Sequence, residues 1–87
     1  MAISPDGIRE RILSALPGAS VAVRDSTGGG DHFAATVIAD SFEGMGLVDR
    51  HRAIYAALGA AMHSDIHALA LETLTPAEAK RKEGNGR

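Results

Sequence analysis

The chain has 87 residues, a net charge of −2 and no cysteine. A chain of this length buries little more than about 60% of its unfolded surface, which leaves room for one small core. The lack of cysteine excludes disulfides, zinc ribbons, thiol nucleophiles and an iron–sulfur site built by this chain alone. We therefore expect one globular domain that depends on apolar packing.

The apolar runs and the first residues bear on location. No apolar run approaches the ~18 residues of a membrane span. The first residues lack the basic start and apolar stretch of a signal peptide. We expect a cytoplasmic protein.

Charge is distributed unevenly along the chain. Residues 1–75 carry five basic and nine acidic side chains, whereas residues 76–87 carry four basic and two acidic ones. A domain that binds nucleic-acid phosphates usually carries more basic than acidic side chains. The first 75 residues therefore give no general nucleic-acid signal.

The first half of the chain predicts a helix and a hairpin. Ser4 can cap a helix over residues 5–16, whose isoleucines and leucines fall on one stripe. Alternating and β-branched residues predict strands over 20–25 and 32–40. The polar, glycine-rich connection 25–31 is short enough for a hairpin.

The second half predicts a long helix, a strand and a short helix. The long helix runs from Leu47 to about Met62, and we expect Asp49, Arg50 and Arg52 to point away from its apolar stripe. The residues assigned to that stripe are Leu47, His51, Ile54, Tyr55, Leu58 and Met62.

A third strand is predicted over residues 66–73. Thr75, with Glu78 three residues later, then forms a capping box that starts a short helix. We expect residues 81–87 to form a mobile basic tail, because no apolar periodicity follows Lys80.

This order defines an α+β sandwich. The hairpin makes the first two strands antiparallel, and the long helical connection favours a parallel third strand. We therefore expect a three-stranded mixed sheet with helices on one face.

Two histidines are brought together by this topology. His32 opens the second strand and His67 lies at the start of the third, so both belong to one edge of the sheet. Neighbouring strands lie about 4.8 Å apart, so both rings could reach one ion or cluster. We expect the glycine-rich loop before His32 to adjust freely. The alternative is two half-exposed surface histidines; any metal role needs outside ligands, because two histidines cannot complete a tetrahedral site.

The remaining polar residues have plainer interpretations. His51 is interpreted as a partly buried structural residue, and His63 as a partner of the negative end of its helix. Asp25 and Asp31 could hold a hard cation, but a solvated polar loop is the better explanation. No nucleophile–base set is evident, so we do not expect an enzyme.

Separated motifs resemble the BolA-like family. They are FEGMGLVDRHRAIYAAL (residues 42–58), IHALAL (66–71) and TLTPAE (73–78), with GDHF (30–33) resembling the family's variable loop. The short loop resembles the IbaG-like acid-stress branch. Gly46-Leu47 and Ala79 depart from the family pattern at positions that concern partner docking.

The resemblance implies a fold and a function. It implies a single domain over residues 1–80 with an α-β-β-α-β(-α) core, similar to a class II KH fold. It also implies a non-enzymatic partner of monothiol glutaredoxins, a monomer or weak homodimer by itself. The pair would share a [2Fe–2S] cluster ligated by the glutaredoxin cysteine, glutathione, and His67 and His32 of this chain. The isolated chain would hold no cofactor.

Basic residues divide between two hypotheses. For the adaptor, we expect Arg50, His51 and Arg52 on the long helix to help dock the glutaredoxin. The alternative is a KH-like nucleic-acid-binding transcriptional regulator. Its candidate contacts are Arg50, Arg52, Lys80, Arg81 and Lys82. The sequence lacks a Gly-x-x-Gly clamp and has few aromatic residues, which argues against strong binding. A third hypothesis is a histidine-based pH or metal sensor that acts alone.

Overall fold

The elements follow the predicted order. The structure, a computed structural model, describes residues 3–66 and 68–85. Its elements are α1 (Pro5–Ala15), β1 (Ser20–Asp25), β2 (His32–Ile38), the 3-10 turn η1 (Asp40–Phe42), α2 (Leu47–Leu58), α3 (Ala61–Ser64), β3 (Ala68–Leu74) and α4 (Pro76–Asn85).

The strands form one mixed sheet in the order β1-β2-β3. β1 is antiparallel to β2, with Val21 opposite Val37. β2 is parallel to β3, with Ile38 opposite Leu74. The prediction of an α+β fold with a three-stranded mixed sheet is confirmed.

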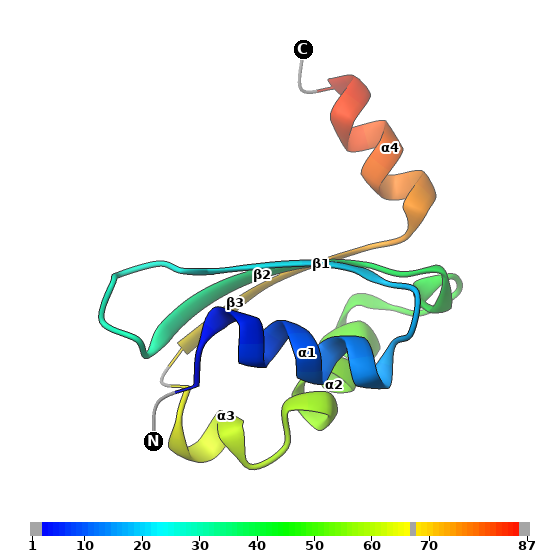
Figure 1. Cartoon of the computed structure of the whole chain (residues 1–87). Coiled ribbons are helices and arrows are strands. Elements are labelled where there is room, and N and C mark those ends of the chain that lie inside the picture. Colours follow the sequence, from blue (N-terminus) through cyan, green and yellow to red (C-terminus); the bar gives the residue numbers. More distant parts are fainter. Residues whose placement is uncertain (1–2, 67, 86–87) are drawn as a thin grey trace.

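The core lies between the sheet and three helices. Figure 1 shows α1, α2 and α3 on one side of the sheet, with α4 projecting from the opposite side. Every second residue of β2 is buried, as expected for a strand with one covered face. The largest fully buried side chains are Phe33, Phe42, Ile8, Ile12, Ile54, Leu58 and Val37. Burying one such side chain stabilises the fold by roughly 1.5–3 kcal/mol.

Helix α1 begins where the sequence predicts. The Ser4 hydroxyl accepts a hydrogen bond from the Gly7 N–H at 3.0 Å, and Pro5 occupies the first turn. Ile8 and Ile12 are fully buried, one helical turn apart. The cap and the apolar stripe therefore explain both the start of α1 and its orientation.

The predicted helix from Leu47 to Met62 is too long. α2 ends at Leu58 because Gly59 takes a positive φ of 56°, a left-handed conformation that stops an α-helix. The predicted third strand also begins too early. The Ile66 N–H donates to the Ala61 carbonyl at 2.9 Å, so Ile66 closes the turn after α3, and β3 starts at Ala68.

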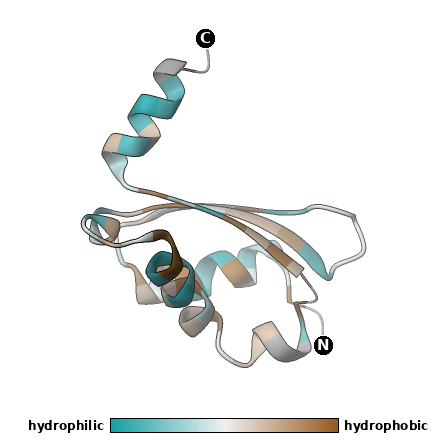
Figure 2. Cartoon of the chain, turned by 180° about the vertical axis from the view of Figure 1, so that it is seen from behind, coloured by the Kyte–Doolittle hydropathy of each residue, from teal (hydrophilic) through white to brown (hydrophobic). Residues whose placement is uncertain are grey.

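Helix α4 is longer than predicted. The capping box is confirmed: the Thr75 hydroxyl accepts from the Glu78 N–H at 3.1 Å, and the Glu78 carboxylate accepts from the Thr75 N–H at 2.9 Å. The helix continues to Asn85 and includes residues 81–85, for which we predicted a tail. Its alanine and basic residues favour a helix without an apolar stripe, and Figure 2 shows mostly hydrophilic residues along it. Among the described helices, none has the length and apolar character needed to cross a membrane.

Candidate functional site

The starts of β2 and β3 lie side by side. His32 is the Cα partner of Ala68 in the parallel register. The Ala68 N–H donates to the Asp31 carbonyl at 3.2 Å, directly before the two strands. The predicted neighbouring strand starts are therefore confirmed. His67, the second predicted ligand, lies outside the described residues, so the histidine pair stays a prediction.

The His32 ring contacts the residue that precedes it. Its Nδ1 lies 2.8 Å from Asp31 Oδ1, and the two side chains are 37% and 52% exposed. The sequence suggests Asp31 only as a cation ligand with Asp25 and does not predict its contact with His32. An acidic residue directly before a candidate histidine ligand is the sequence signal that could have indicated it.

The loop before His32 is held by one carboxylate. Asp25 accepts hydrogen bonds from the backbone N–H groups of Thr27, Gly28 and Gly30, at 3.2, 2.8 and 2.8 Å. Positive φ angles at Gly28 and Gly30 allow the chain to wrap around the carboxylate. The loop is therefore organised, which corrects our expectation that it adjusts freely. Asp25 is used by the backbone, and within the described residues no group of three or more potential ligands forms a metal site.

Arg50 is buried, so the prediction that it points away from the core is wrong. Its Nε donates to the Met45 carbonyl at 3.0 Å, and Nη1 donates to the Thr73 carbonyl at 3.1 Å. Nη1 and Nη2 contact the two carboxylate oxygens of Glu78 at 2.7 and 3.3 Å. The guanidinium carbon also lies 5.7 Å from the centre of the Phe42 ring. A charged side chain can face inward when its donors meet acceptors from several elements at once.

The Arg50 contacts form a brace between α2, β3 and α4. The hydrogen bond from Arg50 and the one from the Thr75 N–H lower the pKa of Glu78 to about 2. The same hydrogen bond with Glu78 raises the pKa of Arg50. Because its guanidinium is committed inside the chain, we remove Arg50 from the candidate docking and nucleic-acid contacts.

The outer face of α2 carries exposed apolar residues. Leu47, Val48 and Tyr55 are 62%, 63% and 41% exposed, although we predicted Leu47 and Tyr55 for the buried stripe. Arg52 is exposed as predicted, whereas His51 is half-buried. We call Leu47, Val48, Arg52 and Tyr55 the α2 outer face. The signal for it was the adjacent pair Leu47-Val48, since neighbouring helical residues cannot share one narrow stripe.

His51 has the partly buried environment that we predicted. Its Nε2 is enclosed and makes no hydrogen bond to any described residue. No other feature of the described chain directs a ligand to this nitrogen, so we assign it no chemistry.

The basic residues of the nucleic-acid hypothesis do not form one surface. Arg52 belongs to α2, whereas Lys80, Arg81 and Lys82 belong to α4, and Figure 1 shows these helices on opposite sides of the sheet. Lys82 also forms an ion pair with Glu72 of β3. The exposed cations on α4 are therefore separate from the cation on α2.

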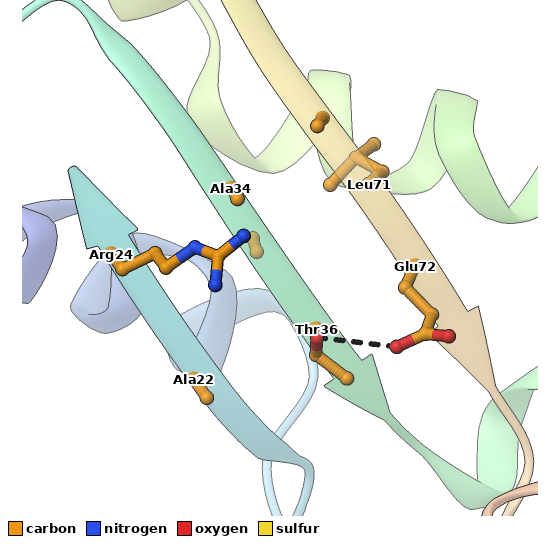
Figure 3. Close-up of a pocket in the computed structure, with 8 residues that line it drawn as sticks. Ala22, Arg24, Ala34, Thr36, Leu71 and Glu72 are labelled. Atoms are coloured by element: carbon orange, nitrogen blue, oxygen red, sulfur yellow. Dashed lines mark hydrogen bonds between the residues drawn. The ribbon is translucent and has the colours of Figure 1, made fainter. Parts of the chain in front are cut away.

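The open face of the sheet forms a shallow trough of about 440 Å³. Figure 3 shows Arg24 extending from β1 toward Ala34, while the Thr36 hydroxyl donates to Glu72 at 3.4 Å. The lining consists of Ala22, Arg24, Ala34, Ala35, Thr36, Ala70, Leu71 and Glu72. The Glu72 carboxylate beside the Thr36 hydroxyl also forms an ion pair with Lys82, and we assign the trough no chemistry.

Known proteins share this sequence and fold. The family model for BolA-like proteins matches residues 14–78. SufE-like protein 1 of Arabidopsis thaliana is 46% identical over 59 residues, which make up 66% of this chain and 16% of that protein. The DNA-binding transcriptional regulator BolA of Escherichia coli is 40% identical over 48 residues, or 55% of this chain and 46% of that protein. The solved structure of a BolA homologue from Coxiella burnetii has 40% identity and a TM-score of 0.78, covering 91% of this chain and 99% of that chain.

The fold and the site define a small α+β domain in which two parallel strands start beside a histidine. The chain belongs to the BolA-like family, because the family model matches most of its length and the Coxiella burnetii structure matches its fold. It spans less than half the length of either curated relative named above. The predicted family is therefore confirmed.

Proposed function

We propose that this protein is a non-enzymatic iron–sulfur adaptor of the IbaG-like type. It binds a monothiol glutaredoxin and co-ligates a [2Fe–2S] cluster through His32 and His67, in cluster trafficking or in iron and stress sensing. The observation that carries the proposal is the pairing of the strand starts, since the Ala68 N–H donates to the carbonyl of Asp31. His67 directly precedes Ala68 in the sequence.

The donor chemistry of the chain fits this cluster. Imidazole nitrogen ligates one iron of some [2Fe–2S] centres, where two histidines replace two cysteines. This chain offers imidazoles and no thiol, so thiolates come from the glutaredoxin and from glutathione. A bound cluster would supply one-electron chemistry and visible absorption. The reducing cytoplasm, where thiols stay reduced, suits such a complex.

The α2 outer face is the surface that we assign to the glutaredoxin. Its apolar members would be covered by the partner, and Arg52 would pair with an acidic group at the rim. This surface replaces the docking cluster expected from sequence: Arg52 stays, His51 lies half-buried beside it, and Arg50 is excluded.

Anaerobic reconstitution with a monothiol glutaredoxin and glutathione tests the proposal. We expect a heterodimer whose visible circular dichroism differs from that of the glutaredoxin homodimer alone. His67→Ala and His32→Ala should each change that spectrum, whereas the control His63→Ala should not. A spectrum identical to that of the homodimer, with no complex in size exclusion, would contradict the proposal.

Nucleic-acid binding is the second candidate, and the exposed cations on α4 favour it. Lys80, Arg81 and Lys82 follow one another on a helix that projects from the sheet. A salt titration of DNA binding separates the two functions, because each phosphate contact adds about −0.9 to the slope of log affinity against log salt. A steep slope, reduced by Arg81→Ala and Lys80→Ala, would support this candidate; a flat one would remove it.

A further inference from the structure

The contact between Asp31 and His32 favours one tautomer of the neutral ring. The Nδ1 of His32 lies 2.8 Å from Oδ1 of Asp31. An ionised carboxylate only accepts hydrogen bonds, so Nδ1 must donate. A neutral imidazole carries one proton, and the lone pair is therefore on Nε2.

The backbone around this pair is anchored on both sides. The Asp31 carbonyl accepts from Ala68 N–H, which ties the residue to β3. The His32 carbonyl accepts from the Ser26 N–H at 2.9 Å and the Ser26 hydroxyl at 3.1 Å. The preceding Gly30 N–H donates to Asp25. These hydrogen bonds fix the backbone of both residues, so the carboxylate is already placed beside the ring. Holding the ring therefore costs little conformational entropy.

We propose that Asp31 is a positioning residue that holds His32 in its Nδ1–H tautomer and presents Nε2 to a metal. Histidine ligands in proteins commonly donate their other ring nitrogen to a carboxylate, which fixes the ring and increases its basicity as a ligand. Asp31 has no contact with the metal in this role and acts through His32. The metal part of the inference rests on the proposed function, whereas the tautomer belongs to the chain alone.

The tautomer is measured directly in the isolated protein. Long-range ¹⁵N–¹H correlation at about pH 8.5, where model imidazoles are neutral, distinguishes a protonated Nδ1 from a protonated Nε2. We expect His32 to be mainly Nδ1–H in the wild type and in the control Asp40→Ala. Asp31→Ala should shift the population toward Nε2–H. Asp31→Asn should keep part of the Nδ1–H form, since its amide oxygen still accepts.

Two outcomes would overturn the inference. One is an Nε2–H ring in the wild type, and the other is an unchanged ring in Asp31→Ala. Slow hydrogen exchange of the Ala68 amide in the variant would show that the β2–β3 pairing is retained. The change in the ring would then not be due to a loss of local fold. If Asp31→Ala itself loses that pairing, the Asp31→Asn variant provides the test. Its Nδ1–H population must then fall part of the way below the wild-type value, and an unchanged population would show that the inference is wrong.

A second readout follows Asp31 into the reconstituted complex. Removing a carboxylate that increases the basicity of the imidazole should raise the reduction potential of the cluster, since the oxidised cluster loses a better electron donor. If no mixed complex forms, the proposed function fails while the tautomer result still stands. If the complex forms and its potential is the same in Asp31→Ala, the effect of Asp31 on the metal is refuted.

Discussion

The two ends of the β2–β3 pair are built from different kinds of contact. At the start of the strands, hydrogen bonds of short sequence range organise the loop and the His32 ring, with Asp25 and Asp31 as acceptors. At the far end, Arg50 reaches Thr73 and Glu78, which are 23 and 28 residues away in the sequence. Loss of the local contacts would leave the core closed, whereas loss of the brace would remove a link between α2, β3 and α4. The molecule thus keeps the contacts on which the core does not depend at the end where a ligand is proposed.

The largest effect should come from removing the aromatic ring beneath the brace. Phe42 is fully buried, and Phe42→Ala leaves a cavity next to Arg50. We expect a loss of about 3–5 kcal/mol in the free energy of unfolding by urea titration. Tyr55→Ala, at an exposed aromatic residue, is the control and should cost less than about 1 kcal/mol. Similar losses in both variants would show that the brace end is not part of the core.

The brace itself should give the next effect. Arg50→Ala removes the guanidinium donors of the Glu78 carboxylate and the Thr73 carbonyl, so the urea midpoint should fall well below that of Arg52→Ala, two positions away on the same helix. The double variant Arg50→Ala/Glu78→Gln should lose less than the sum of the single changes, because the two side chains share one interaction. Additive losses would contradict the brace.

The brace also predicts how stability depends on pH. The pKa of Glu78 is lowered from 4.5 to about 2, so its contribution is complete above pH 4.5 and is lost as the pH falls toward 2. The difference in urea midpoint between wild type and Glu78→Gln should therefore be constant near neutral pH and shrink below pH 4.5. A difference in urea midpoint that grows on acidification would contradict the lowered pKa of Glu78.

The smallest loss of global stability should come from the loop at the start of the β2–β3 pair. Asp25→Ala removes the acceptor of three backbone N–H groups in an exposed loop, and we expect about 1 kcal/mol. The change should be local, with faster hydrogen exchange at Gly28 and Gly30 and unchanged exchange in α2. Asp49→Ala is the control. Faster exchange throughout the protein would show that the two ends are not independent.

The sequence predicts the fold well because its signals there are local. The Ser4 cap, the β-branched and aromatic residues of β2 and the Thr75–Glu78 capping box each depend on neighbours within one turn or strand. The parallel pairing follows from the length of the connection. These features determine strand order, and through it the neighbourhood of His32.

The orientation of α2 could not be read from the sequence in the same way. A helical stripe assigns charged residues to water, but Arg50 finds acceptors on η1–α2, β3 and α4 that exist only after folding. With Arg50, Ile54 and Leu58 on the covered side, Val48 and Tyr55 face outward, and Leu47 is exposed at the first position of the helix. Similarly, Asp31 next to His32 gives no periodic signal, because their contact depends on the turn that presents both residues. The adjacent pairs Leu47-Val48 and Asp31-His32 are sequence signals for the docking surface and the positioning residue, but neither pair determines an orientation.

The position of α4 has a practical consequence for labelling. The helix follows the last residue of β3, while His32 is paired with the first. With a rise of about 3.3 Å per residue, the strand separates these points by about 20 Å. A fluorophore or surface tether attached to an exposed residue of α4, such as Glu83, would leave the His32 end facing the solution. Immobilised this way, the protein presents its proposed ligands to a soluble partner rather than to the support.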